Sequence, residues 1–435
     1  MGFGEQRKQY KKGKLLRIPA SEHGIHPRQI CEKTKDVLRR LSKAGYEAYL
    51  VGGAVRDLML GKQPKDFDIA TSAKPEEVRR LFSSCRLIGR RFRLAHIYYG
   101  RFYLEVATFR GPHDASGKGI TSNDGRIIHD NVYGTLEEDA LRRDFTINAL
   151  FYDLASGDVL DYVSGVKDIR SGTLRLIGDP EQRYREDPVR MLRAIRFASK
   201  LDLQIEEATQ APIQEMGHLL DNIAPARLFD ESLKLFHSGQ AAKTLDQLRD
   251  YQLFQYLFPI TEMGLYDETF YAFVKSALQN TDKRIRSGQS VTPAFLYSVM
   301  LWRAVQQHYK ENIAIGHPVT QAYHIAASTV LKEQVHSTAI PRRFSTMARE
   351  IWSLQSRFIY RDCRRAISFI GHPRFRAAYD FHCLRAAVND EVDTDECQWW
   401  TDFQHQDEAQ KLVMCRGFKS NRRRRRKKKK PPNPS

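Results

Sequence analysis

Two aspartates separated by one residue, Asp66 and Asp68, are the side chains of this 435-residue sequence whose spacing most directly suggests chemistry. Alternate residues of an extended strand point to the same face, so both carboxylates would lie side by side while Phe67 and Ile69 face a core. Neighbouring carboxylates repel each other, and a bound divalent cation removes that repulsion. Mg²⁺ usually takes one or two carboxylates together with phosphate oxygens of a substrate, and Mn²⁺ also suits oxygen ligands. The pair therefore predicts a metal site that accepts a phosphate-containing ligand.

A glycine pair just upstream could hold those phosphates. Residues 49–51 predict a strand, Gly52 and Gly53 a turn, and residues 54–60 a short helix. Glycines let backbone amides approach an anion closely. Each feature alone is common in ordinary turns and exposed strands. Their order and closeness together favour a nucleoside triphosphate held against a metal ion.

A second polar stretch begins at Asp187 and Pro188, which fit the start of a helix as its capping residue and its first helical residue. Arg190, Arg193 and Arg196 follow at intervals of three and share one broad face. By spacing alone, a surface helix with a capping aspartate is the simpler interpretation.

The elements that must position these residues form a mixed head followed by helices, an α+β fold with a small mixed β-sheet. Residues 75–82 predict a helix, and residues 97–99 and 102–109 predict a hairpin around Gly100 and Arg101. Within that hairpin, Glu105 either faces solvent or adds a third carboxylate to the metal site. The expected divisions are a flexible basic leader (1–26), the nucleotide-binding head (27–164), an all-helical neck (165–238), an all-helical body (239–415) and a disordered basic tail (416–435).

The charge of the chain favours a polyanionic partner. The net charge is +18, and removing the nine consecutive basic residues near the C-terminus still leaves +9. Nucleic acid is the first candidate for such a partner, although a solvated tail without a specific role is the alternative. The residues expected to bind RNA are Arg422, Arg423, Arg424, Arg425, Arg426, Lys427, Lys428, Lys429 and Lys430.

The remaining composition indicates a folded cytoplasmic protein. Hydrophobic residues make up 41% and charged residues 28% of the chain. The six cysteines are scattered without a Cys-x-x-Cys pattern, which suits a reducing compartment and argues against a disulfide scaffold. The N-terminus lacks the apolar region of a signal peptide, and no run approaches the length of a membrane helix. We expect a monomer with no membrane span.

The glycine pair, the two aspartates and the Arg-Arg-Asp-Phe-Thr run at residues 142–146 resemble the motifs of class II nucleotidyltransferases. This family contains bacterial poly(A) polymerases and CCA-adding enzymes. The resemblance implies that Asp187 and Arg190 hydrogen-bond the base of the incoming nucleotide, which is reasonable because Arg only donates and a carboxylate only accepts. It further implies a catalytic group of Asp66, Asp68 and Asp144, a metal pair of Asp66 and Asp68 with Glu105 as a third ligand, and nucleotide contacts from Gly53, Arg56, Arg143, Arg193 and Arg196.

Residues 89–96, the helical segments near residues 340 and 372, and the basic tail are similar to poly(A) polymerases of the proteobacterial type. Ala54 points weakly the other way, because CCA-adding enzymes often have alanine there. The resemblance implies template-independent transfer of adenylates from ATP to RNA 3′ ends with release of pyrophosphate. A CCA-adding tRNA nucleotidyltransferase is the alternative within the family. A non-catalytic basic RNA-binding protein is the alternative from another class.

Overall fold

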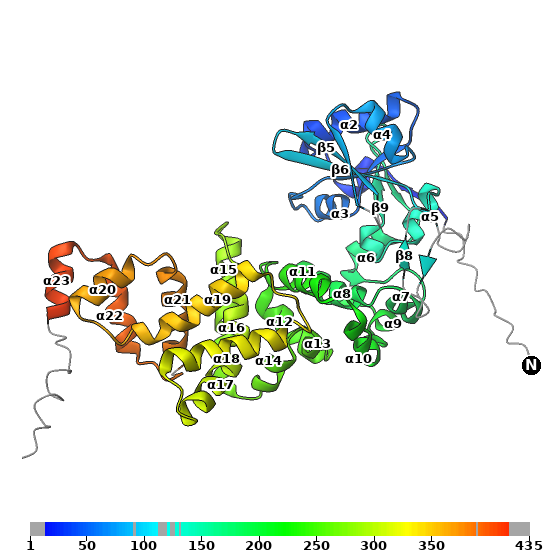
Figure 1. Cartoon of the computed structure of the whole chain (residues 1–435). Helices are drawn as coiled ribbons and strands as arrows, with labels where there is room; N and C mark the ends of the chain where they lie inside the picture. The colour runs from blue at the N-terminus through cyan, green and yellow to red at the C-terminus, as the bar shows by residue number, and fades with distance from the viewer. Residues whose placement is uncertain are drawn as a thin grey trace, which may run out of the picture. The chain divides into compact units, whose positions relative to one another are not determined.

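The computed structural model describes residues 14–89, 93–111, 120–121, 127–129, 132–388 and 390–416 (Figure 1). The chain divides into two compact units, residues 1–220 and residues 221–435. The first unit combines a sheet with helices, and the described part of the second is helical, which confirms the predicted α+β fold. The boundary falls inside the predicted neck, so most of that segment belongs with the head. No helix in the described ranges is long and apolar enough to cross a membrane.

An eight-stranded sheet forms the centre of the first unit, in the order β1-β10-β9-β2-β3-β6-β5-β4. Neighbouring strands are antiparallel except β3 and β6, which run parallel. A separate two-stranded sheet pairs β7 with β8. The strands are β1 (Leu16–Ile18), β2 (Ala48–Val51), β3 (Asp68–Thr71), β4 (Cys85–Ile88), β5 (Leu94–Tyr99), β6 (Phe102–Thr108), β7 (Ile120–Thr121), β8 (Ile127–His129), β9 (Leu150–Tyr152) and β10 (Val159–Asp161).

The sheet has a core face and a polar face because its strands alternate. Helices α2 (Glu32–Lys43) and α4 (Pro75–Leu81), which lie side by side in Figure 1, pack their apolar residues against Ile69, Leu104 and Val106. Ile69 pairs in register with Val106, so Asp68 and Glu105, one residue earlier on each strand, share the opposite face. The predicted strand at 49–51, helix at 75–82 and hairpin at 97–109 are confirmed with small shifts at their ends.

The predicted flexible leader is wrong for residues 14–26. Leu16 to Ile18 form β1, which adds to the sheet edge against β10, and α1 (Ala20–His23) follows. His23 lies with its Nε2 2.8 Å from the Gly157 carbonyl oxygen, and Ile25 is buried. A short alternation of apolar residues was enough to complete the sheet edge. Residues 1–13 lie outside the described part of the chain.

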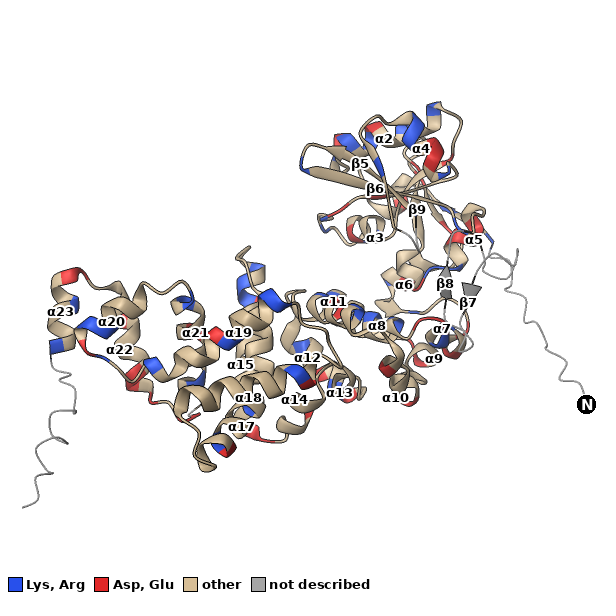
Figure 2. Ribbon diagram, viewed as in Figure 1, with Lys and Arg blue, Asp and Glu red and all other residues tan. Residues whose placement is uncertain are grey.

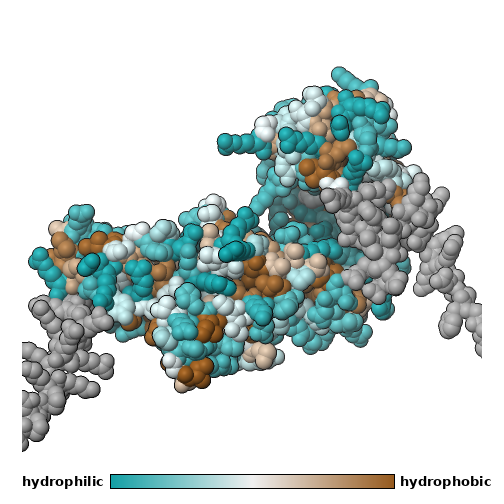
Figure 3. Space-filling view, in the orientation of Figure 1, coloured by the Kyte–Doolittle hydropathy of each residue, from teal (hydrophilic) through white to brown (hydrophobic). Residues whose placement is uncertain are grey.

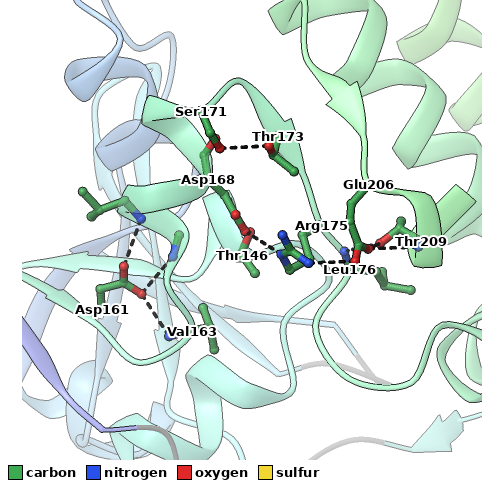
Figure 4. Close-up of polar contacts among 12 residues, drawn as sticks. Thr146, Asp161, Val163, Asp168, Ser171, Thr173, Arg175, Leu176, Glu206 and Thr209 are labelled. Atoms are coloured by element: carbon green, nitrogen blue, oxygen red, sulfur yellow. Dashed lines mark hydrogen bonds and ion pairs between the residues drawn. The ribbon is translucent and has the colours of Figure 1, made fainter.

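The first helices after the sheet are fixed to the head by a polar network (Figure 4). Arg175 bridges Asp168, 3.2 Å away, and Glu206, 2.7 Å away. Thr146 of the head donates to the same Asp168 carboxylate at 2.7 Å. Helix α5 (Leu136–Leu141) precedes β9 in the chain. The helices that follow the sheet are α6 (Gly165–Arg170), α7 (Pro180–Glu186), α8 (Val189–Leu201), α9 (Glu207–Gln210) and α10 (Ile213–Met216).

The predicted all-helical neck is wrong in one respect. Two short parallel strands, β11 (Thr173–Leu174) and β12 (Gln204–Ile205), pair on either side of α7 and α8 in the sequence. Each has two residues, too few to show strand periodicity. Their pairing closes the segment that carries α8 and so holds this helix beside the head.

The second unit is a series of helices that carry both basic and acidic residues (Figure 2), and its surface in Figure 3 is largely hydrophilic with apolar patches. Its helices are α11 (Pro225–Phe236), α12 (Ala241–Asp250), α13 (Phe254–Leu257), α14 (Pro259–Gly264), α15 (Glu268–Arg286), α16 (Pro293–Met300), α17 (Trp302–Ala314), α18 (Val319–Gln334), α19 (Arg342–Leu354), α20 (Cys363–Ile370), α21 (Phe375–Ala387), α22 (Thr394–His405) and α23 (Glu408–Arg416). The predicted basic tail, residues 422–430 included, lies outside the described residues.

The expectation that the cysteines form no disulfides is wrong. Cys363 of α20 is bonded to Cys415 of α23, and Cys383 of α21 to Cys397 of α22, with Cα–Cα distances of 5.0 and 5.3 Å. The partners are 52 and 14 residues apart in the sequence. Only the packing of the helices brings them together, which spacing could not show.

Candidate active site

The two aspartates lie at the start of β3. Asp68 is the first residue of the strand, whereas Asp66 lies in the segment before it, so the predicted strand begins later than expected. Both aspartates are exposed, while Phe67 and Ile69 are buried at 8% and 0% exposure. The predicted alternation is therefore confirmed, although only Asp68 is within the sheet.

The carboxylates carry uncompensated negative charge. Surrounding protein atoms exclude water from Asp68 and so raise its pKa, and the negative charges of Glu105 and Asp66 raise it further. The positive charge of Arg143 lowers it, and the resulting pKa of Asp68 is about 6. Glu105 also lies 3.4 Å from His96 Nε2. Across the described ranges, no three His, Cys, Asp or Glu residues converge as a metal site. Two carboxylates with one raised pKa fit a cation whose remaining ligands are phosphate oxygens and water.

The glycine turn lies between β2 and α3 (Gly53–Met59). Gly52 has φ 70° and ψ −128°, a conformation that only glycine adopts without strain. A Cβ on Gly52 would lie 3.6 Å from Arg143 Nη1, and one on Gly53 would lie 3.5 Å from Arg56 Nη2. The structure thus brings two of the predicted nucleotide-binding arginines, Arg56 and Arg143, to the turn.

Neighbouring side chains hold these two arginines. Buried Arg56 donates to Asn148 Oδ1 at 2.5 Å and to Asp57 Oδ1 at 2.7 Å. Arg143 donates to Asp139 Oδ2 at 2.8 Å. Asp139 and Asn148 were not predicted as site residues. Both lie close to the Arg-Arg-Asp-Phe-Thr run, but nothing in their spacing shows which arginine they contact.

Phe197 of α8 is the centre of a cluster that the sequence analysis missed. The guanidinium groups of Arg56, Arg193 and Arg196 lie 5.3, 5.3 and 4.5 Å from its ring centroid. Phe145 packs edge-on against the same ring at 5.6 Å. Cations over a ring face are attracted by its quadrupole. Phe197 therefore gathers three of the predicted nucleotide-binding arginines, one from the head and two from α8.

Asp144 anchors α8 to the head. Its largely buried carboxylate accepts hydrogen bonds from Arg193 Nε at 2.7 Å, the Phe145 amide at 2.8 Å and Asn148 Nδ2 at 3.3 Å. Burial opposes ionisation, but Arg193 and these hydrogen bonds outweigh it and hold the pKa of Asp144 at about 2. These contacts make Asp144 a positioning residue for Arg193, and its predicted catalytic role stays a prediction.

Lys200, also missed from the sequence, adds to the positive charge of the site. The pKa of Lys200 is lowered, mainly by burial and also by the positive charges of Arg56, Arg196 and Lys65. The negative charge of Asp57 partly opposes this shift. Lys200 follows Arg196 by four residues, a helical spacing that could have revealed it. Cations crowded in this way favour a bound anion.

The predicted base-reading pair lies at the junction of α7 and α8. Asp187 directly follows α7, and its Oδ1 accepts from the amide of Val189, the first residue of α8, at 3.3 Å. Buried Arg190 donates to the Arg183 carbonyl at 2.7 Å and to Glu186 Oε2 at 2.9 Å. The helix thus begins one residue later than predicted, at Val189 instead of Pro188.

Arg183 and Glu186 support this junction and were not predicted. Arg183 donates to the same Glu186 oxygen at 2.6 Å and to the carbonyls of Arg142 and Arg143 at 2.6 and 2.7 Å. One carboxylate therefore fixes two arginines, and one arginine ties α7 to the head. The orientation of Arg190 depends on both.

Three family models match the chain. They are the poly(A) polymerase head domain (residues 48–175), a probable RNA- and SrmB-binding site of polymerase A (202–265) and the polymerase A arginine-rich C-terminus (315–432). The chain is 49% identical to Poly(A) polymerase I of Salmonella typhimurium over 399 residues, covering 89% of this chain and 85% of the relative. It is 43% identical to that of Haemophilus influenzae over 418 residues, covering 94% and 91%.

CCA-adding enzymes are relatives over a shorter stretch. The enzyme of Lactobacillus helveticus is 42% identical over 212 residues, covering 48% of this chain and 51% of the relative. A solved Thermotoga maritima CCA-adding enzyme complexed with tRNA has a TM-score of 0.58 at 19% identity, covering 91% of this chain and 88% of the other. That likeness shows the fold alone.

The head-domain match and the sequence relatives place the chain among the nucleotidyltransferases. Within that class, the chain belongs to the bacterial poly(A) polymerase family, because its poly(A) polymerase relatives match it over most of both lengths. This confirms the branch that the sequence resemblance implied.

Proposed function

We propose that the protein extends RNA 3′ ends with AMP taken from ATP and releases pyrophosphate. The observation that carries this proposal is the pair Asp66 and Asp68 beside a glycine turn and a group of cations: desolvation by the surrounding protein, with the charges of Glu105 and Asp66, raises the pKa of Asp68 to about 6. Negative charge for a metal and positive charge for a triphosphate thus lie together. The names of the poly(A) polymerase relatives support the same reaction.

Asp66 and Asp68 would hold Mg²⁺, which Mn²⁺ could replace, because both ions prefer oxygen ligands. When bound, the cation supplies a Lewis acid for activating the RNA 3′-hydroxyl and stabilising the leaving oxygens. Glu105, near Asp68 and His96, would contribute charge and orientation to the metal pair. The protein itself forms no covalent bond to the substrate.

The glycine turn and the cations would hold the triphosphate. The absence of a side chain at Gly52 and Gly53 leaves backbone amides accessible to phosphate oxygens. Arg56 and Lys200 supply charge there, and Arg56 is already oriented by Asn148. Groups fixed before the reaction stabilise developing charge without reorganising.

Base selection would fall to Asp187 and Arg190. A carboxylate accepts from the exocyclic amine of adenine, and a guanidinium donates to a ring nitrogen. Because Glu186 holds Arg190 at 2.9 Å, the donor has a defined direction. A wrong base would leave polar groups of the site unpaired, which can discriminate strongly between nucleotides.

Primer extension with each nucleoside triphosphate supplied separately tests the proposal. An unstructured RNA oligonucleotide should receive a long adenylate tail with ATP and little extension with CTP. Asp66→Ala and Asp68→Ala should abolish extension, whereas Asp36→Ala, an exposed change on α2, should not. Efficient incorporation of CTP into tRNA lacking its 3′ end, stopping after CCA and without tails on the oligonucleotide, would overturn the proposal.

A further inference from the structure

We propose that the polar face of strands β4, β5 and β6 is a stacking surface for the 3′-terminal bases of the single-stranded RNA acceptor. The surface, here called the ring platform, consists of Arg86, His96, Tyr98 and Tyr103. This inference rests on the proposed function, since it concerns where the second substrate of the same reaction binds.

The three rings of the ring platform are already arranged against one another. His96 and Tyr103 are stacked with centroids 4.5 Å apart and planes 8° apart. Tyr98 lies 5.7 Å from Tyr103. The strand register pairs Tyr98 with Tyr103 and His96 with Glu105, and the alternation of strands puts all four on one face. Tyr103 is 44% exposed, so a ring face remains accessible to a base.

Arg86 adds positive charge to this surface. Arg86 lies on β4 and pairs in register with His96 of β5. It is exposed, and its guanidinium lies 5.3 Å from the Tyr98 ring centroid. Single-stranded nucleic acids are bound by aromatic rings that stack on bases together with cations that contact the backbone. An aromatic cluster with one exposed ring, Tyr103, and an exposed arginine beside it has this combination, which an ordinary buried core lacks.

The ring platform is continuous with the carboxylates. Glu105 lies 3.4 Å from His96 on the same face of the sheet, so it connects the ring platform to the carboxylates. Asp68 and Glu105 lie at the same level on the neighbouring strands β3 and β6. A base stacked on Tyr103 would therefore lie on the face of the sheet from which a 3′-hydroxyl must approach the metal.

The strand order separates the two substrates. Part of the sheet has the strand order β2-β3-β6-β5-β4. The carboxylates lie at the start of β3 and the glycine turn follows β2, whereas the ring platform lies on β6, β5 and β4, on the other side of β3. The triphosphate of ATP occupies the glycine-turn side in the proposed function. The ring platform is left on the opposite side, which fits the acceptor RNA rather than the incoming nucleotide.

Steady-state extension of a short oligoadenylate tests this assignment, with Tyr103→Ala, Tyr98→Ala and the ring-preserving Tyr103→Phe compared with the wild type. Phe102→Ala is the matched control, because Phe102 neighbours Tyr103 but its ring lies on the other face, 5.2 Å from Lys33 Nζ. Base stacking in single-strand sites predicts that each alanine variant raises the KM for RNA about tenfold. The KM for ATP should stay unchanged, and Tyr103→Phe and Phe102→Ala should resemble the wild type.

A binding measurement without catalysis separates this proposal from the proposed function. An oligonucleotide with 2-aminopurine at its 3′ terminus should be quenched by the wild type without ATP or metal, and quenched less by Tyr103→Ala. Thermal unfolding identifies variants that do not fold, and if Tyr103→Ala is one of them, Tyr98→Ala, which should also reduce the quenching, carries the comparison. A raised KM for ATP alone, an equal effect of Phe102→Ala, or unchanged quenching in Tyr103→Ala would overturn the ring platform. Loss of extension in the wild type with normal quenching would overturn only the proposed function.

Discussion

Replacing Asp68 by Asn should stabilise the metal-free protein while abolishing its activity. The folded-state pKa of Asp68 is raised from 3.8 to about 6, so the folded protein holds this proton more tightly than the unfolded chain does. The stabilisation that goes with the bound proton is complete below about pH 4 and is lost as pH rises to about 6. At pH 8 the ionised carboxylate therefore destabilises the fold, and a neutral amide removes that cost.

The size of the effect follows from the pKa shift. A shift of about two units corresponds to about 3 kcal/mol at a fully desolvated site. Asp68 is exposed, so solvent screening reduces the expected gain to about 1 kcal/mol. For a unit of this size, that gain would raise the melting temperature by about 2–4 °C.

Thermal unfolding at pH 8 with a chelator, and again with excess Mg²⁺, measures the effect. Asp68→Asn should melt higher than the wild type with chelator. Added Mg²⁺ should stabilise the wild type more than the variant, because a ligand stabilises only the state that binds it. Asp36→Asn, which removes a surface ion pair 3.9 Å long, should change stability by no more than about 0.5 kcal/mol under either condition.

Two results would refute the reasoning. The first is an Asp68→Asn variant no more stable than the wild type in chelator at pH 8, which would mean that the fold does not raise the pKa of Asp68. The second is an equal gain from Mg²⁺ in both proteins, which would place the metal elsewhere.

Three further predictions concern the supports of the site and the tail. Asp144→Asn should lower the free energy of unfolding by about 2 kcal/mol at pH 7, measured by denaturant unfolding, because the ion pair with Arg193 is largely buried. Since the pKa of Asp144 is about 2 in the folded protein, this stabilisation is present above about pH 4 and is lost as the pH falls toward 2. If the double variant Asp144→Asn with Arg193→Gln loses as much stability as the two single variants combined, the ion pair between Asp144 and Arg193 is contradicted. Glu186→Gln should raise the KM for ATP about tenfold with little change in the KM for RNA, because Arg190 loses the carboxylate that orients it. Deleting residues 419–435 should flatten the salt dependence of RNA binding by about 0.7 in log–log slope for each phosphate that the tail neutralises, and an unchanged slope would favour a solvated tail.

The sequence alone determined the features that depend on residues close together in the chain. The alternation around Asp66 and Asp68, the glycine turn after a strand, and the periodic face of Arg190, Arg193 and Arg196 are local patterns, and each follows from strand or helix geometry. They were sufficient to predict an α+β fold and most of the candidate site residues. Their roles came from a resemblance to a family, which no spacing can replace.

Contacts between distant segments were decided only by the tertiary structure. Phe197 gathers arginines from α3 and α8, Asp144 is directed to Arg193 by the docking of α8 on the head, and the disulfides need their helices to pack side by side. The ring platform needs the register that pairs Tyr98 with Tyr103 and the strand order that puts them beyond β3. Such contacts depend on how elements pack and align, because a shift of one residue in register would turn the same rings to the other face of the sheet.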